Sequence, residues 1–239
     1  TRAIPQGIRI RTGKYGETEL TPDTFAYIVQ YPNAGGNIED YRAFVEKAHA
    51  AGCKVAVAAD ILSLALLTPP GEWGADIVFG TTQRLGTPMF YGGPSAAYFA
   101  TRDEYKRNMP GRIIGWSKDK YGKLCYRMAL QTREQHIKRE KATSNICTAQ
   151  ALLATMAGFY AVYHGPEGIR TIAGRIHSIA AFLEKEINKL GYRQMNAQYF
   201  DTLRFALPDN VSAQQVRTVA LSKEVNLRYF KERRRGHEH

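Results

Sequence analysis

The most informative absence in the sequence is a gap among its lysines. The chain is basic, with 33 Lys and Arg against 22 Asp and Glu, yet no lysine occurs between Lys54 and Lys106. The chain also lacks a run of about eighteen apolar residues, the length that a helix needs to cross a bilayer, so we expect no membrane span. It opens without the charged, apolar and small-residue pattern of a signal peptide.

Cysteine is scarce as well. The three cysteines are odd in number and widely spaced, which argues against a disulfide framework and against a zinc site. Reduced thiols indicate a cytosol-like compartment, so we expect a cytoplasmic protein, or a mitochondrial matrix protein if the source is eukaryotic. The chain begins at Thr1 rather than at a methionine, and we expect it to be a fragment of a longer polypeptide.

Two short apolar runs, Lys54–Ala58 and Ala75–Phe79, have the pattern of buried parallel strands. The residues between them suffice for a crossover, so we expect the two strands to be neighbours in one sheet. Asp60 follows the first strand, Gln83 and Arg84 follow the second, and ligands bind at the carboxyl ends of such strands. An acid here would suit a pyridine-type cofactor, whose protonated ring nitrogen pairs with a carboxylate while a lysine forms an imine. The carboxylate is present and the lysine is missing.

The sequence after the second strand resembles a known family. Thr81–Ala100 (TTQRLGTPMFYGGPSAAYFA) is similar to the amino-terminal half of glycine decarboxylase, the P-protein of the glycine cleavage system. The similarity continues through Arg102–Asp119, Gln131–Ala154 and Tyr199–Leu203, and the run Gln131–Ala154 is highly specific. It covers nearly the whole chain except the tail 231–239.

This resemblance implies an α/β fold of the type I pyridoxal-phosphate (PLP) transferase kind. The two halves of proteins in this family are alike, and only the carboxyl-terminal half carries the lysine that binds PLP. Aligning the chain with that half through Pro88 and Gly92–Pro94 places Gln83 at the lysine position. The resemblance therefore implies no catalytic residue, no metal and no covalently bound PLP in this chain. Asp60 matches the acid that contacts the pyridine nitrogen. As an isolated acid it would more often be a loop or capping residue, so we interpret it as a relict or structural residue.

For the whole protein the resemblance implies glycine dehydrogenase (decarboxylating) activity. Glycine would lose carbon dioxide, with PLP accepting the electrons left behind, and the aminomethyl group would pass to the lipoyl arm of H-protein. The expected partners are the homologous carboxyl-terminal half or subunit and H-protein. We expect this chain alone to be inactive and to help complete and enclose the active site.

Two alternatives remain open. One is a self-sufficient PLP enzyme that uses Lys106, Lys138 or Lys141, although none of these follows a strand at the expected place. The other is a non-catalytic basic binding module. From Thr101 to Lys141, twelve Lys and Arg stand against five acids. A solvated face or an acidic protein partner explains this charge better than nucleic acid does, because no RNA-binding, zinc-finger or helix-turn-helix pattern accompanies it.

The pattern predicts three parts. Residues 1–143 form a partial large domain with a mainly parallel sheet, lacking its amino-terminal part. Residues 144–230 form a small α+β domain, and 231–239 form a basic, disordered tail. The expected strands are Ile8–Arg11, Ala26–Gln30, Lys54–Ala58, Ala75–Phe79, Ser95–Ala100, Gly115–Lys118, Lys123–Arg127, Tyr192–Met195, Thr202–Leu207 and Val225–Phe230. The expected helices are Asn37–Gly52, Ile61–Leu67, Ile146–Tyr163, Glu167–Leu190 and Ala213–Ser222. Asn37 and Ser212 are the expected N-caps of the first and the last of these, and Gly165 and Pro166 separate the third from the fourth. A turn at Asp119–Gly122 is expected to join Gly115–Lys118 and Lys123–Arg127 in a β-hairpin. His49, near the end of the first helix, is interpreted as a surface partner of the helix dipole.

Overall fold

The structure is a computed structural model that describes residues 3–13, 17, 21, 23–109, 113–130, 139–142 and 150–229. It divides into two compact units. The first comprises Thr1–Asn33 and Glu39–Gly174, and the second comprises Ala34–Ile38 and Arg175–His239. The domain boundaries predicted at residues 143 and 230 lie outside the described residues, so they stay predictions.

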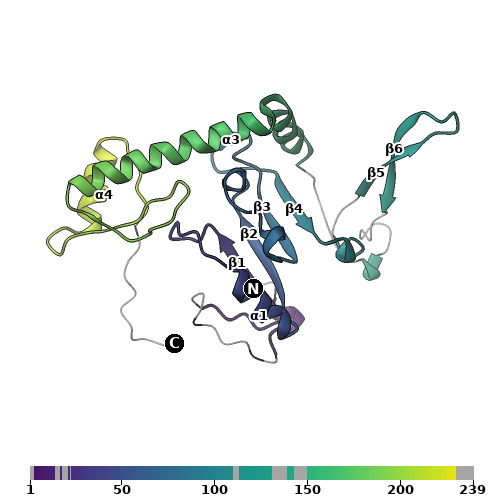
Figure 1. Ribbon diagram of the computed structural model, residues 1–239, viewed down its shortest axis with the longest axis horizontal. Coiled ribbons are helices and arrows are strands. Elements are labelled where there is room, and N and C mark those ends of the chain that lie inside the picture. Colours follow the sequence, from purple (N-terminus) through teal and green to yellow (C-terminus); the bar gives the residue numbers. More distant parts are fainter. Residues whose placement is uncertain are drawn as a thin grey trace. The chain divides into compact units, whose positions relative to one another are not determined.

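The first unit contains a four-stranded sheet in the order β1–β2–β3–β4 (Figure 1). Strands β1 (Ala26–Tyr31), β2 (Lys54–Ala59) and β3 (Ile77–Thr81) run parallel to one another. Strand β4 (Ala97–Thr101) pairs with β3 in the antiparallel direction. The prediction of an α/β fold with a mainly parallel sheet is therefore confirmed.

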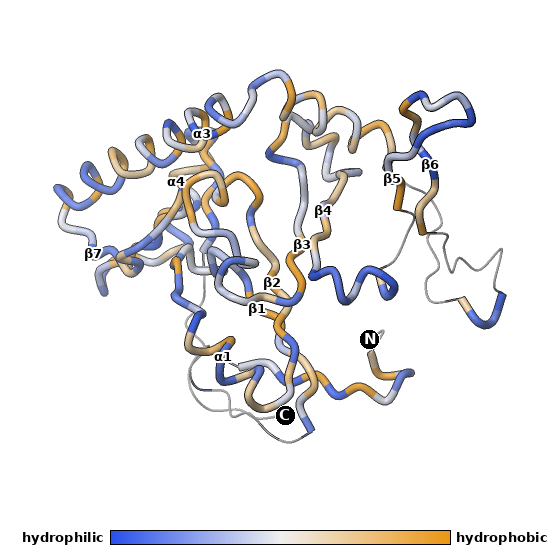
Figure 2. The backbone as a smooth tube through the Cα atoms, turned by 45° about the vertical axis from the view of Figure 1, so that its right-hand side comes forward, coloured by the Kyte–Doolittle hydropathy of each residue, from blue (hydrophilic) through white to orange (hydrophobic). Residues whose placement is uncertain are grey.

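The core of this sheet follows from the composition of β2. Val55 and Val57 are fully buried and Ala59 nearly so, and Figure 2 shows the apolar character of β2 and β3. β-Branched side chains pack well on a pleated surface, so a Val-rich strand suits the interior of the sheet. Beside it, the rings of Tyr31 and Trp73 pack edge to face at 5.8 Å, which joins β1 to the turn before β3.

Helix α1 (Arg42–Ala50) begins five residues later than predicted, with Tyr41 and not Asn37 at its N-cap. The residues before this helix, Ala34–Ile38, belong to the second unit. There the backbone N–H of Ile38 donates to the carbonyl of Gln198 at 3.0 Å. Ile38 thus belongs to a segment that is bonded to residue 198, and helical structure begins only at Arg42.

Two predicted strands are wrong. Residues 8–11 form no strand, and the backbone N–H of Ile8 donates instead to the carbonyl of Ala3. Residues 225–229 form none either; Glu224 adopts a left-handed conformation and the N–H of Val225 closes the preceding helix on Ala220. Phe230 lies outside the described residues. In both places local backbone bonds take the groups that a sheet would need.

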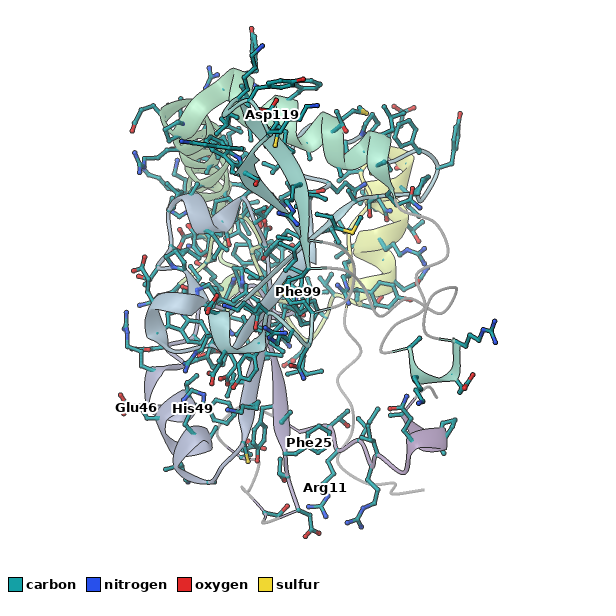
Figure 3. All side chains as sticks on the ribbon, turned by 90° about the vertical axis from the view of Figure 1, so that its right-hand side faces the viewer. Arg11, Phe25, Glu46, His49, Phe99 and Asp119 are labelled. Carbon is teal, nitrogen blue, oxygen red and sulfur yellow. The ribbon has the colours of Figure 1, made fainter. Side chains whose placement is uncertain are left out.

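The predicted hairpin is confirmed. Strands β5 (Ile113–Lys118) and β6 (Leu124–Leu130) pair with each other as a separate antiparallel sheet. Asp119, visible at the tip in Figure 3, accepts hydrogen bonds from the backbone N–H groups of Tyr121 and Lys123. Gly122 supplies the left-handed conformation (φ +81°) that the turn requires.

The two remaining helices agree closely with the sequence pattern, and the last two strands are shorter than predicted. Helix α3 (Ala151–Lys189) is interrupted at Gly165, just before Pro166, where two helices were predicted. Helix α4 (Ala213–Ser222) has the predicted cap at Ser212, which forms a capping box with Gln215. Residues 146–149 of the predicted helix lie outside the described ranges. The short strands are β7 (Arg193–Gln194) and β8 (Phe205–Ala206).

Short 3-10 turns complete the described chain. They are Ile4–Gln6, Ser63–Ala65, Pro70–Trp73, Asp103–Tyr105 and Arg139–Lys141. Ser63–Ala65 is all that forms of the predicted helix Ile61–Leu67. Across the described ranges, no helix is both long and apolar enough to span a bilayer.

Candidate functional site

Asp60 stands at the carboxyl end of β2, where the sequence pattern places it. Its backbone N–H donates to the carbonyl of Tyr31 and extends the β1–β2 ladder by one bond. Its Oδ1 atom accepts from the N–H groups of Leu62 at 2.9 Å and Ser63 at 3.4 Å, and the Ser63 hydroxyl donates to the Asp60 carbonyl. The side chain therefore caps the turn that follows the strand.

The second oxygen of this carboxylate belongs to an ion pair. The Nε atom of Arg84 lies 2.8 Å from Oδ2 of Asp60, and the two side chains are 35% and 23% exposed. A charge-assisted bond at this distance is stronger than a neutral one, and partial burial protects it from screening. Arg84 thus joins the loop after β3 to the loop after β2.

Gln83 begins the same turn. Its backbone N–H donates to the hydroxyl of Thr81, and its carbonyl accepts from the N–H of Thr87, so the chain reverses tightly after β3. Ala58 and Phe79 are register partners in the parallel β2–β3 pair. The expectation that these two strands are neighbours and open at one edge is therefore confirmed.

Tyr98 on β4 completes this edge, and sequence reasoning missed its role. Its hydroxyl donates to the carbonyl of Ala59 at 2.9 Å. Burial, reinforced by the negative charge of Asp60, raises the pKa of Tyr98 to about 12. Gly80 makes room for the ring, since a Cβ atom there would lie 2.7 Å from Cε1 of Tyr98. A glycine inside a strand was the available signal.

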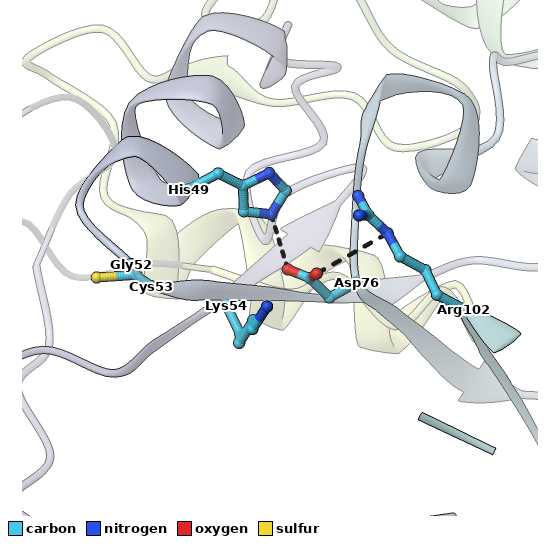
Figure 4. A pocket seen from close by; sticks show the side chains of 6 residues that line it. All are labelled: His49, Gly52, Cys53, Lys54, Asp76 and Arg102. Atoms are coloured by element: carbon cyan, nitrogen blue, oxygen red, sulfur yellow. Dashed lines mark hydrogen bonds and ion pairs between the residues drawn. The ribbon is translucent and has the colours of Figure 1, made fainter. Parts of the chain in front are cut away.

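A second polar cluster lies at the opposite, amino-terminal edge of the parallel strands (Figure 4). Asp76, directly before β3, is buried, and Oδ2 accepts from the N–H of Val55 at 2.8 Å and lies 2.8 Å from Nε2 of His49. Arg102 and Tyr105 reach the other oxygen at 3.8 Å and 3.4 Å. His49, shown on α1 in Figure 3, is thus a partner of a buried carboxylate and not merely of the helix dipole.

Electrostatics decide what this second cluster can do. Burial by itself would raise the pKa of Asp76, but the bonds from Val55 and His49 and the positive charges of His49 and Arg102 outweigh it and lower the pKa. An open hollow of about 270 Å³ lies beside the cluster, lined also by Gly52, Cys53 and Lys54. Because its carboxylate is already held from several sides, the cluster is a cross-link between α1, β2 and β3.

The lysines considered as imine formers lie elsewhere. Lys106 follows β4, whose last residue, Thr101, pairs with Ile77 at the start of β3. It is therefore at the edge opposite Asp60, and its amine forms an ion pair with Asp103 at 2.7 Å. Lys141 ends a 3-10 turn, and Lys138 lies outside the described residues. Within the described ranges, no group of three His, Cys, Asp or Glu side chains could hold a metal ion.

Comparison with known proteins identifies the family to which the chain is similar. The sequence model described as glycine cleavage system P-protein matches residues 1–236. The chain belongs to this family. It is 85% identical over 230 residues to a glycine dehydrogenase (decarboxylating) from Bacteroides fragilis and 55% identical to one from Nostoc punctiforme. These matches cover 96% of the chain but only 24% and 23% of the relatives, so the chain spans about a quarter of their length. The resemblance to the amino-terminal half of the family is confirmed.

Solved structures give the same fold. The crystal structure of a glycine decarboxylase (P-protein) in inhibitor-bound form superposes with a TM-score of 0.77 at 36% identity, over 87% of this chain and 48% of that one. An alanine–glyoxylate aminotransferase from Nostoc sp. shares the fold, with a TM-score of 0.54 at 14% identity over 84% of this chain and 51% of that one. The predicted type I PLP-transferase fold is confirmed.

The edge around Asp60 does not fit a lysine-linked pyridine cofactor. Gln83 offers an amide where an amine would be needed to form an imine. Both oxygens of Asp60 already accept hydrogen bonds, one from backbone N–H groups and one from Arg84. A protonated ring nitrogen would therefore have to compete with a guanidinium for the same carboxylate.

Proposed function

We propose that the protein is part of a glycine dehydrogenase (decarboxylating), in which glycine loses carbon dioxide and its aminomethyl group passes to the lipoyl arm of H-protein. This chain contributes no imine-forming residue. It pairs with a homologous carboxyl-terminal half or subunit, which binds PLP, and it helps to form the walls of the active site. Membership of the P-protein family supports the reaction. The odd number and wide spacing of the three cysteines support a cytoplasmic location, or the mitochondrial matrix in a eukaryote.

The single observation that carries the division of labour is the turn after β3. A type I site would place an amine there, whereas this chain has Gln83 followed by a guanidinium that pairs with Asp60 at 2.8 Å. Lys106, which was considered as an alternative imine-forming residue, is at the other end of the strands and forms an ion pair with Asp103. That placement argues against a self-sufficient PLP site in this chain.

The location of the cofactor lysine tests this proposal. The complete enzyme is treated with borohydride, which fixes PLP on its lysine, and is then digested and mapped by mass spectrometry. We expect the pyridoxyl-lysine in a peptide outside this chain, and exchange of labelled bicarbonate with the glycine carboxylate only in the complete enzyme. A pyridoxyl group on Lys106, Lys138 or Lys141 would refute the division of labour.

The hairpin β5–β6 is the element that we propose meets H-protein. Register pairs bring Ile114 opposite Met128 and Trp116 opposite Tyr126, with the two aromatic rings 6.2 Å apart. All four side chains are exposed, Trp116 and Tyr126 to 72% and 76%. A two-stranded sheet is marginally stable alone, so an exposed apolar ladder of this kind favours a protein partner.

Charge selects the kind of partner. Lys118, Lys120 and Lys123 surround the hairpin tip, and the whole chain has a formal net charge of +11. A basic rim of this kind speeds encounter with an acidic protein, and the effect weakens as salt rises. The acidic partner of our proposal is the lipoyl carrier.

Salt dependence tests the proposed contact. In the complete enzyme, reversing charge at Lys118 and Lys123 should lower the association rate with H-protein and flatten its dependence on ionic strength. Reversing Lys185 and Lys189 on α3 removes the same charge elsewhere and should leave the salt dependence steep. Equal effects of the two pairs would refute the hairpin contact. An oligonucleotide retained at low salt by the parent and lost with the hairpin variant would favour the nucleic-acid alternative instead.

A further inference from the structure

We propose that Arg84 is the residue that closes this half of the enzyme to pyridine cofactors, because its guanidinium permanently occupies the cation position beside Asp60. The inference rests on the proposed function and deepens it. The missing lysine explains why no covalent link forms. It does not explain why the carboxylate at the end of β2 would not pair with a pyridine nitrogen, and the ion pair with Arg84 supplies that explanation.

The geometry gives Arg84 the role of a resident cation. The Asp60 carboxylate is held at the edge by the N–H groups of Leu62 and Ser63, so its position is fixed by the turn. Its remaining oxygen faces Nε of Arg84 at 2.8 Å. A protonated pyridine nitrogen is a single N–H donor that seeks such an oxygen, and a guanidinium offers the same kind of charged N–H donor.

The residue at the lysine position and the residue that supplies the cation are neighbours in the sequence. Arg84 directly follows Gln83, so the position that lost the amine and the position that supplies the cation are adjacent in one turn. The turn is fixed by bonds from Gln83 to Thr81 and from Thr87 to Gln83. A guanidinium is always charged, so the pair persists at every pH at which Asp60 is ionised.

The consequence is that an amine at position 83 is insufficient to restore cofactor binding. Gln83→Lys supplies the imine-forming group, but Arg84 still holds Asp60. Removing the guanidinium together with the amide, in Gln83→Lys/Arg84→Thr, frees the carboxylate for a ring nitrogen. Two substitutions are therefore needed to create the site, and one is insufficient.

The experiment uses the complete enzyme incubated with PLP and reduced with borohydride, and it quantifies pyridoxyl-Lys at position 83 by peptide mass. The native pyridoxyl-lysine in the other half is an internal reference in every sample. We expect the double variant to be labelled at least about tenfold more at position 83 than Gln83→Lys alone. Gln83→Lys/Arg9→Thr, which removes an arginine from the exposed pair with Asp23, is the matched control and should remain as low as Gln83→Lys.

Chemical rescue separates a resident cation from a merely structural arginine. Ethylguanidinium should suppress the labelling of the double variant at position 83, and ethylammonium at the same concentration should suppress it less. Gln83→Lys/Arg84→Gln is a second test variant should the threonine destabilise the turn. Equal labelling with and without Arg84, or labelling in neither, would overturn the inference. Absence of the reference label in the other half would instead refute the proposed function, so the two failures are distinguishable.

Discussion

The imidazole of His49 at the end of α1 lies 2.8 Å from the buried carboxylate of Asp76, which is 27 residues further along the chain. The same carboxylate accepts the backbone N–H of Val55 at 2.8 Å, so one side chain fastens a helix to the first residues of two neighbouring strands. This edge of the sheet therefore has the features of a structural centre.

Replacing Asp76 by asparagine should be strongly destabilising. The asparagine amide would present either an N–H₂ group or a weaker oxygen acceptor to the donors that now share the buried carboxylate. We expect this change to lower the free energy of unfolding by about 3 kcal/mol. Denaturant unfolding measures the change. Asp103→Asn is the control, because Asp103 is 86% exposed and its pair with Lys106 should contribute less than about 1 kcal/mol. Equal losses in both variants would contradict the assigned role.

Acid should remove the contribution of Asp76 to the free energy of unfolding. The pKa of the folded carboxyl lies below its ordinary value of 3.8. Between those two values the unfolded chain binds more protons than the folded one, so the stability from Asp76 is complete above about pH 3.8 and is lost as the pH falls through the folded pKa. The difference in unfolding free energy between the parent and Asp76→Asn should therefore shrink in acid. A difference that stays constant from neutral pH into this window would contradict the lowered pKa.

Gly86→Ala should destabilise the loop that carries Arg84. Gly86 has φ +78°, and a Cβ atom there would lie 2.6 Å from Cδ2 of Tyr160 on α3. Backbone strain and the clash together should cost about 2 kcal/mol or more. Gly92→Ala is the control for backbone strain alone, because Gly92 has φ +107° and a Cβ atom there has no neighbour within 4 Å.

Gly158→Ala is a second control inside α3. A Cβ atom at Gly158 also has no neighbour within 4 Å, so this substitution should stabilise the protein by up to about 1 kcal/mol. Thermal unfolding of the three variants gives the order, and a Gly86→Ala protein as stable as Gly92→Ala would show that Tyr160 is not in contact.

Tyr98→Phe should cost about 1 kcal/mol at neutral pH, because the Ala59 carbonyl loses its hydroxyl donor. The pKa of Tyr98 is raised to about 12 from an ordinary 10.0. The phenol's contribution is therefore complete below about pH 10 and is lost as the pH rises toward the folded pKa. Comparing the unfolding free energies of the parent and the variant at neutral and alkaline pH checks both statements. A gap that widens above pH 10 would contradict them.

Local pattern sufficed where neighbouring residues decide the structure. The cap of α4 at Ser212, the hairpin turn between Asp119 and Gly122 and the break at Gly165 were all predicted, because each depends on residues a few positions apart. The ends of β1 and β2 were predicted to within one residue for the same reason, whereas β3 begins and ends two residues later than predicted. Placing β2 beside β3 then brought Asp60 and Arg84 to one edge.

What could not be predicted depends on distant partners. Nothing near Asp76 in the sequence indicates that its partners are His49, 27 positions before it, and Arg102, 26 positions after it. The bond from Ile38 to Gln198 likewise joins residues 160 positions apart, and no local pattern indicates it. The pattern likewise placed a carboxylate at the end of β2 without indicating that an arginine, rather than a ligand, would be its partner.

The adjacency of Gln83 and Arg84 has an evolutionary consequence. A single mutation that returned an amine to position 83 would bring no new chemistry while its neighbour keeps its charge, and a mutation of the neighbour alone would only weaken the fold. Under our proposal neither single step brings a gain, so selection acting on one mutation at a time would not create a cofactor site in this chain.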